Sequence, residues 1–380
     1  MRHETTEKFL SEQSAGAAKG AIWDGDREAQ VQHRLASARR AFSTRNADLQ
    51  QAARLDRHSR PQAGDLVLAK VVAIGHHTKL ESPAGRRQAL YPGDEIIVAF
   101  GNRYAPDQFE AKVPAELGPC DLVAGGGIAS KMLAKNARTR NPTRIEPIGL
   151  LADREGKILN LAQFTPLLDR DLEPAAGCRV IVVVGTSMNA GKTTTVARLI
   201  HGLTLAGFRV GAAKVTGTGS GGDLWAMRDA GAAIALDFTD AGHATTAGVP
   251  IARLVEDSLR LIASVARGHD VAIVEVADGL FQEETAALLR SARFAGVIDH
   301  IILAAGDAMG AAFGCQWLQR HGLPLSLIAG CVSSSPLGSR ETEQATGLNV
   351  ASLSDLADPQ FAPGFCFADQ PAVRAIREVA

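Results

Sequence analysis

The 380-residue chain has few cysteines and no arrangement of them that indicates a metal site or a disulfide framework. The five are far apart, odd in number and never in a C-x-x-C pair: Cys120, Cys178, Cys315, Cys331 and Cys366. This spacing indicates neither a zinc knuckle nor a disulfide scaffold, and it is typical of proteins from a reducing compartment. We therefore expect a cytoplasmic protein in which Cys315 and Cys331 are core thiols.

Long apolar runs are missing as well. The longest, such as Val180–Val184 and Ile301–Ala305, have about five residues, whereas a membrane-spanning helix needs about 20. The charged start of the chain, Met1 to Lys8, has no apolar stretch behind it and does not resemble a signal peptide. We expect no membrane partner.

The chain also lacks an excess of charge of one sign. Lysine and arginine number 40 and aspartate and glutamate number 41, for a formal net charge of -1. Without a net positive field, the protein is not expected to bind nucleic acid. With 46% hydrophobic and 21% charged residues, the composition is that of an ordinary globular protein, and the length suggests two domains.

Apolar residues near the N-terminus recur mostly at steps of three and four. They are Val31, Leu35, Ala38, Phe42, Leu49 and Ala52. This period predicts one amphipathic helix over about residues 26–57, within an N-terminal helical segment of residues 1–63. The helix can pack against the protein's own body or pair in a coiled coil, so a homodimer stays open.

Between residues 64 and 163 the pattern changes to short apolar strands separated by tight turns. The expected strands cover residues 66–74, 95–100, 148–152 and 157–161. After the three glycines at 125–127, residues 128–135 are compatible with a helix that interrupts the strands. We predict a small β-rich, barrel-like domain over residues 64–163.

From residue 175 to 380, apolar strands alternate with helical segments. Strands are expected at 180–184, 209–214, 271–276, 300–305 and 325–329, and helices include 193–206, 223–230 and 251–267. Such alternation produces a parallel sheet with helices on both faces. The predicted fold is therefore an α/β domain preceded by a β-rich domain and an N-terminal helix.

The first strand of this domain leads directly into a G-x-x-x-x-G-K-[ST] motif, the pattern of a P-loop. The predicted phosphate cradle comprises Gly185, Thr186, Ser187, Met188, Asn189, Ala190, Gly191, Lys192, Thr193 and Thr194. In such a loop backbone N–H groups face phosphate oxygens, Lys192 reaches the β and γ phosphates, and the Thr193 hydroxyl binds Mg²⁺. The motif predicts a P-loop NTPase domain that binds ATP or GTP with Mg²⁺, with Lys192 as a catalytic residue.

Charged residues follow later strands at the same edge of the sheet, where ligands of α/β proteins collect. Glu275 ends a buried strand and is predicted to be catalytic and to bind the metal; a structural acid is the alternative. Lys214 is predicted to be catalytic by binding a second anionic group, with a surface lysine as the alternative. Asp223 either binds Mg²⁺ through water or only caps a helix, and Asp278 is a further candidate acid.

Three other segments carry polar groups of interest. The loop Gly101–Asp107 is a candidate for ligand or interdomain contact, and His243 is a candidate for lining the P-loop cleft. His76 and His77 follow a strand, where adjacent side chains point to opposite faces, so a metal site at this pair is not expected.

Residues of about 178–355 resemble known families of P-loop proteins. The run Gly185–Thr193, then K-x-T at Lys214–Thr216, then G-D at Gly222–Asp223 followed by R-x-A-G-A at Arg228–Ala232 is similar to molybdopterin-guanine dinucleotide biosynthesis protein B. The same stretch resembles dethiobiotin synthetase in the Gly-Thr that opens the P-loop, in Lys214 and Glu275, and in the late Gly330–Val332 segment.

These resemblances imply the P-loop NTPase fold and a nucleotide cofactor. A third similar family is the P-loop family that includes D-amino-acid N-acetyltransferases. Ser333–Ser335 stand where dethiobiotin synthetases carry an asparagine that reads adenine, and no N-K-x-D guanine signature occurs. The base therefore stays open between ATP and GTP.

The leading functional hypothesis is an Mg²⁺-dependent enzyme that carries out phosphoryl transfer or condensation on a small anionic metabolite. Its partner is then a small-molecule substrate held between the two domains. Two alternatives remain: a nucleotide-binding adaptor or switch with slow hydrolysis, and an acyltransferase that uses the phosphate cradle for a coenzyme A-type diphosphate.

Overall fold

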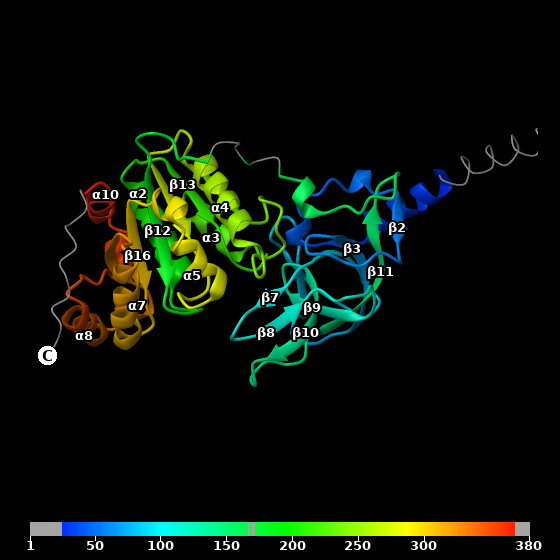
Figure 1. The fold of residues 1–380 in the computed structure, drawn as a ribbon, viewed down its shortest axis with the longest axis horizontal. Coiled ribbons are helices and arrows are strands. Elements are labelled where there is room, and N and C mark those ends of the chain that lie inside the picture. Colours follow the sequence, from blue (N-terminus) through cyan, green and yellow to red (C-terminus); the bar gives the residue numbers. More distant parts are fainter. Residues whose placement is uncertain (1–24, 166–167, 169–171, 369–380) are drawn as a thin grey trace, which may run out of the picture.

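The computed structural model describes residues 25–165, 168 and 172–368, and these form two regions that lie side by side (Figure 1). The β-rich region covers residues 25–165 and the α/β region covers residues 172–368. This is the predicted class, a parallel α/β fold preceded by a β-rich part.

The N-terminal part of the β-rich region departs from the predicted single helix over residues 26–57. The helix covers residues 25–37 and is followed by β1 (Arg39–Arg40), η1 (Phe42–Thr44), η2 (Leu49–Gln51) and β2 (Arg54–Asp56). Beyond residue 37 the prediction is wrong because tertiary contacts override the helical period. The Arg40 guanidinium donates to the Thr44 carbonyl at 2.6 Å, and Phe42 is fully buried in a core of the α/β region.

Five strands of the β-rich region close into a barrel. The strands are β3 (Leu66–Ala73), β6 (Glu95–Phe100), β9 (Cys120–Ala124), β10 (Ile128–Lys135) and β11 (Thr143–Ala152), with β7 (Arg103–Tyr104) and β8 (Phe109–Lys112) attached beside β10. The sheet order is β1-β6-β3-β11-β9-β10-β8-β7, and an additional parallel pairing of β6 with β10 closes the ring. The predicted helix over residues 128–135 is wrong, because this segment is the strand that completes the closure.

A separate two-stranded hairpin lies between β3 and β6 in the sequence. It consists of β4 (Lys79–Glu81) and β5 (Arg87–Ala89), with Glu81 directly opposite Arg87. Because side chains alternate along a strand, Lys79, Glu81 and Arg87 lie on one face of this hairpin.

The α/β region contains a six-stranded, all-parallel sheet in the order β14-β13-β15-β12-β16-β17. The strands are β12 (Arg179–Gly185), β13 (Val210–Lys214), β14 (Ile234–Asp237), β15 (Val271–Glu275), β16 (His300–Ala304) and β17 (Leu325–Ala329). Strand β12 is central, and its side chains alternate between two cores: Val182 points into one and Ile181 into the other. This alternation requires a helical layer on each face of the sheet.

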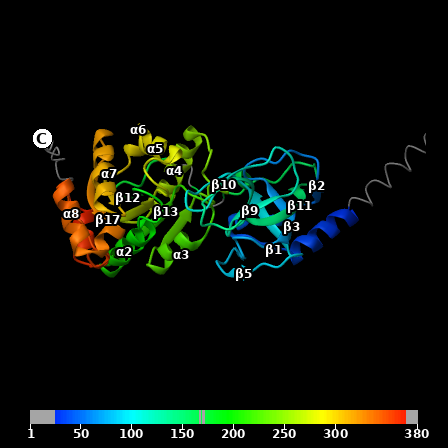
Figure 2. The ribbon, with the colours of Figure 1, turned by 90° about the horizontal axis from the view of Figure 1, so that it is seen from below.

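The helices form these two layers (Figure 2). One layer contains α4 (Ile251–Ala266), α5 (Glu283–Leu289), α6 (Ala292–Ala295) and α7 (Ala308–Arg320). The other contains α2 (Lys192–Leu205), α3 (Gly222–Asp229), α9 (Leu353–Leu356) and α10 (Phe361–Cys366), and α8 (Pro336–Thr346) packs beside α7. Among the residues in these described ranges, no helix is both long and apolar enough to cross a membrane.

The two regions meet in a close-packed seam. Arg45 of the β-rich region forms ion pairs with Asp237 at 3.1 Å and Asp240 at 2.7 Å, and its side chain is only 12% exposed. Gly126 lies so near the α/β region that a Cβ atom there would be 1.9 Å from the Gly219 carbonyl oxygen. Buried ion pairs and backbone contact of this kind fix the position of one region against the other.

Candidate functional site

The P-loop connects the end of β12 to the start of α2 through two residues with positive φ, Asn189 at 61° and Gly191 at 98°. A Cβ atom on Gly191 would lie 2.9 Å from the Gly330 Cα atom. Glycine is therefore required at this position by both conformation and space. The loop opens onto the N-terminus of a 14-residue helix, an arrangement suited to binding phosphate.

Lys192, at the start of α2, folds back along the loop. Its ammonium group donates to the Ser187 carbonyl at 2.9 Å, and the residue is 7% exposed. Burial lowers the pKa of Lys192, although Glu275 opposes this shift. A lysine held in this way is directed along the cradle and not into solvent.

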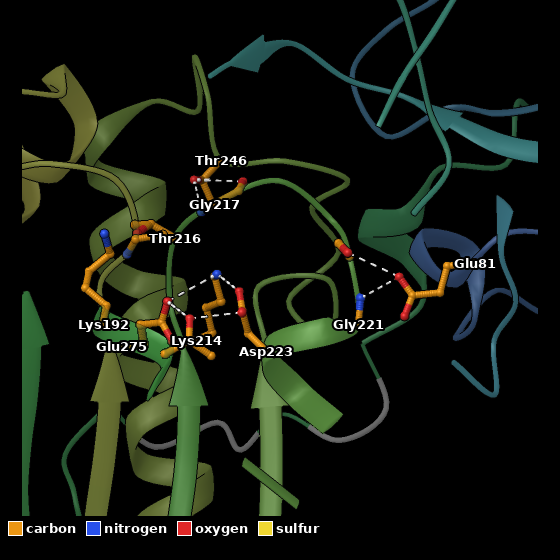
Figure 3. Close-up of polar contacts among 12 residues, drawn as sticks. Glu81, Lys192, Lys214, Thr216, Gly217, Gly221, Asp223, Thr246 and Glu275 are labelled. Atoms are coloured by element: carbon orange, nitrogen blue, oxygen red, sulfur yellow. Dashed lines mark hydrogen bonds and ion pairs between the residues drawn. The ribbon is translucent and has the colours of Figure 1, made fainter. Parts of the chain in front are cut away.

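Lys214, Asp223 and Glu275 converge beside the P-loop from β13, α3 and β15 (Figure 3), and Thr193 of α2 joins them through hydrogen bonds. The Thr193 hydroxyl donates to Asp223 Oδ1 at 2.9 Å and lies 3.3 Å from Glu275 Oε1. The Lys214 ammonium donates to Asp223 Oδ2 and is 3.3 Å from Glu275 Oε1. The structure thus brings Lys214, Asp223 and Glu275 together around Thr193; the sequence predicts each of them for catalysis or metal binding.

The electrostatics of this cluster follow from burial and pairing. Burial raises the pKa of Glu275, which is 1% exposed, and the charge of Lys214 opposes this shift. For Asp223, burial alone would raise the pKa, but the contact with Lys214 brings it below its usual value. The two carboxylates in turn raise the pKa of Lys214 despite its burial. Lys214 is therefore a buried, ion-paired lysine and not a surface one.

The oxygen atoms of the cluster fit Mg²⁺. Glu275 Oε2 is buried and has no hydrogen-bond partner among the described residues, so one carboxylate oxygen is left for a ligand. Mg²⁺ takes few protein oxygens and completes its shell with water and phosphate. Across the described part of the chain, no group of three or more His, Cys, Asp and Glu side chains is placed to hold a metal ion. The cluster therefore fits an ion that the protein, the nucleotide and water would hold jointly.

The loop that leads from β13 to Asp223 is held from both sides (Figure 3). The Gly217 N–H donates to the Thr246 hydroxyl at 2.9 Å within the α/β region. From the β-rich region, Glu81 Oε2 accepts from the Gly221 N–H at 3.0 Å and from the Ser220 hydroxyl at 3.1 Å. Glu81 is 4% exposed, so a buried carboxylate of one region positions a loop of the other.

A cavity of about 660 Å³ lies between the P-loop edge and the β-rich region. Met188, Lys214, Asp223 and Asp278 line it on one side. Asp278 is, with Asn189, one of the two non-glycine residues with positive φ among those that the structure describes, and its φ is 64°. Burial raises its pKa. Backbone strain of this kind gathers at functional sites, and the cavity has the size of a small-molecule site.

The remaining sequence candidates have different outcomes. The loop Gly101–Asp107 makes the expected interdomain contacts, since Asn102 donates to the Ala247 carbonyl at 3.1 Å and Asn189 lies 3.3 Å from Asp107. His243 is instead paired with Asp257 of α4 at 2.7 Å. Cys315 is buried as predicted, but the prediction for Cys331 is wrong, because this residue follows β17 on an exposed turn.

Sequence reasoning missed the wall of the cavity that belongs to the β-rich region. Its charged residues are Lys79, Glu81, Arg87 and Arg103. No motif spacing marks them, because three lie on a hairpin that the strand pattern does not resolve. Only Arg103 carried a signal, through its place in the polar loop after β6.

Comparisons with known proteins find no matching family model and no matching curated protein. Among solved structures, signal recognition particle 54 kDa protein from Aeropyrum pernix in complex with GDP is 19% identical, with a TM-score of 0.32 over 55% of this chain and 50% of that one. A duf1611 family protein from Anabaena variabilis is 16% identical, with a TM-score of 0.34 over 52% and 60% of the two chains. A nucleotide-binding protein from Archaeoglobus fulgidus in complex with ADP is 12% identical, with a TM-score of 0.35 over 51% and 93%.

The chain therefore spans only half the length of the first of these proteins and three fifths of the second. TM-scores this low carry no conclusion about function. The P-loop architecture rests on the chain's own strand, loop and helix.

Proposed function

We propose that this protein is an Mg²⁺-dependent P-loop enzyme that binds ATP or GTP and carries out phosphoryl transfer or condensation on a small anionic metabolite. The observation that carries the proposal is the convergence of Thr193, Asp223 and Glu275 beside the P-loop, where Asp223 also lines a cavity large enough for a substrate. The β-rich region adds Lys79, Arg87 and Arg103 to the lining of this cavity, which supports a second, anionic ligand beside the nucleotide.

In this proposal each residue has a separate role. Lys192 neutralises charge on the β and γ phosphates. Thr193, Asp223 and Glu275 hold Mg²⁺ directly or through water, and the bound ion supplies positive charge to the phosphate oxygens. Lys214 keeps the Asp223 and Glu275 carboxylates oriented through its ion pairs.

Asp278 is the group placed to accept a proton from the substrate. It lines the cavity on the same side as Asp223, and burial raises its pKa toward the range useful for a base. Its proton acceptance requires the ionised form, so we expect activity to fall as pH falls through this raised pKa.

The test is turnover of Mg·ATP and Mg·GTP by the full-length protein, followed by ³¹P NMR with and without a set of small carboxylates. We expect Glu275→Gln to keep nucleotide affinity within threefold and to lower the rate at least tenfold, about 1.4 kcal/mol of barrier. Glu341→Gln, an exposed change on α8, is the matched control.

Each other result points to a different function. An unchanged rate in Glu275→Gln would make this residue a structural acid. Slow hydrolysis that no small molecule stimulates would favour the adaptor or switch. Transfer of the acetyl group of acetyl-CoA to an amine or hydroxyl group of a small molecule, with release of the CoA thiol and without nucleotide consumption, would favour the acyltransferase.

A further inference from the structure

The β-rich wall of the cavity is positively charged. Lys79, Arg87 and Arg103 line it, and the carboxylate among the lining residues of that wall, Glu81, already accepts two hydrogen bonds from the α/β region. His77 adds no charge near neutral pH, since burial, with the charge of Arg103, lowers its pKa to about 3. The wall therefore presents an unbalanced excess of cations to the cavity.

Arg103 is the most constrained of these cations. It is 7% exposed, its NH1 donates to the Val123 carbonyl, and its NH2 donates to Gln108 Oε1 at 2.8 Å. Its Nε is buried and has no hydrogen-bond partner among the described residues. Burial lowers the pKa of Arg103 to about 10, so it stays charged at neutral pH.

A buried guanidinium without a carboxylate partner is costly to maintain. Arg103 makes no ion pair within the described residues; Asp107 and Asp278 act on it only at longer range. Two of its nitrogens are fixed by neutral oxygens and NH1 also lies 3.3 Å from His77 Nε2, which orients the group, and the Nε–H donor has no partner among the described residues. An oriented guanidinium with an unused donor is suited to binding a planar or tetrahedral anion.

Lys79 and Arg87 extend the positive wall toward the P-loop edge. Both are exposed on the β4–β5 hairpin, and neither side chain has a partner among the residues that the structure describes. The Arg87 guanidinium lies 3.8 Å from the position of a Cβ atom on Gly222, the residue before Asp223. An anion on this wall is therefore next to the start of α3 and across from Lys214.

We infer that the β-rich region binds the acceptor substrate through a carboxylate or phosphate group held by Arg103, Arg87 and Lys79. This rests on the proposed function, and it assigns the nucleotide to one region and the recognition of the acceptor to the other. The acceptor is an anionic molecule of metabolite size, with its reacting group directed at Asp278 and the P-loop.

The test is calorimetric titration of small anions into the full-length protein saturated with Mg·ADP or Mg·GDP. Inorganic phosphate is the probe of one arm, and succinate and citrate are the probes of the other. We expect the wild type to bind the probes of one of these two arms. Arg103→Met and Arg87→Ala should each weaken that binding at least tenfold and change nucleotide affinity less than threefold. Arg144→Ala, an exposed change on β11, is the matched control and should change neither.

Arg87→Ala keeps the test valid if Arg103→Met fails to fold, because Arg87 is exposed and has no partner in the described part of the chain. Binding of no probe by the wild type, or equal binding by wild type and Arg87→Ala, would overturn the inference. Loss of the anion in Lys192→Ala would also overturn it, because the anion would then lie in the P-loop. Failure of the proposed function has a different result: the wild type would not bind Mg·ADP or Mg·GDP, or it would bind nucleotide and show no turnover that a small molecule stimulates.

Discussion

The two walls of the cavity differ in how their charged side chains are paired. On the α/β wall, Lys214 is paired with both Asp223 and Glu275, and Thr193 joins them by hydrogen bonds. On the β-rich wall, Arg103 is buried and donates to neutral oxygens. Arg87 is exposed and has no partner among the described residues. A cluster whose charges are paired with one another, with one carboxylate in excess, can stay folded without ligands and accept a metal and a nucleotide together. An unbalanced cationic wall is suited to an anion from outside the protein.

The comparison depends on the seam that holds the walls together. Its strongest contact is Arg45, which is nearly buried between Asp237 and Asp240. The coulombic effect of these two carboxylates raises the pKa of Arg45, although burial opposes it. Removal of this residue tests whether the two walls act as one site.

Arg45→Ala is expected to have the largest effect on stability. It leaves two buried carboxylates without their cation, which costs about 3–5 kcal/mol in the free energy of unfolding. Urea denaturation at pH 7 measures the loss. Arg154→Ala, which breaks an exposed ion pair with Glu28, is the control and should cost far less. A loss from Arg45→Ala no larger than that of the control would mean that the seam does not depend on this ion pair.

His77→Gln is expected to have a smaller effect, on the pH dependence of stability. The pKa of His77 is about 3 in the folded protein and about 6.5 in the unfolded chain, so the unfolded chain binds more protons between these values. Wild-type stability therefore falls as pH falls below 6.5, by at most about 1.4 kcal/mol per pH unit from this group.

Urea denaturation at pH 7 and pH 5 should then show wild type losing up to about 2 kcal/mol more than His77→Gln. His201→Gln, an exposed change on α2, is the control and should behave as wild type. An equal pH response in wild type and His77→Gln would mean that burial and the charge of Arg103 do not hold His77 in its neutral form.

The two walls also differed in how far the sequence could predict them. The P-loop is a contiguous motif, and the strand ends that carry Lys214 and Glu275 follow from local apolar runs, so the positions of these residues at one edge of the sheet were predictable, whereas the sequence left Asp223 open between a metal ligand and a helix cap. Arg103 and Arg87 are brought together only by barrel closure and by the packing of a hairpin. The polar loop that contains Arg103 is the one local signal, and nothing in the sequence of the hairpin encodes the placement of Arg87.

The errors in the fold have the same origin. Residues 128–135 have a helix-compatible sequence, but they pair with β6 and β9 and close the barrel. Phe42 fits a helical period, but it is buried against the α/β region. In both cases a contact distant in sequence decides the conformation, and local propensity does not.

The central claim, that the P-loop edge binds the phosphates of a nucleotide, is tested most directly by the affinity of Lys192→Ala for nucleotides and nucleosides. Calorimetry should give at least a 100-fold loss for Mg·ADP or Mg·GDP, about 2.7 kcal/mol, and a change of less than threefold for adenosine or guanosine. Arg198→Ala, an exposed change on the same helix, should bind all four as wild type does. Binding of neither diphosphate by the wild type, or equal losses for diphosphate and nucleoside in Lys192→Ala, would contradict the claim.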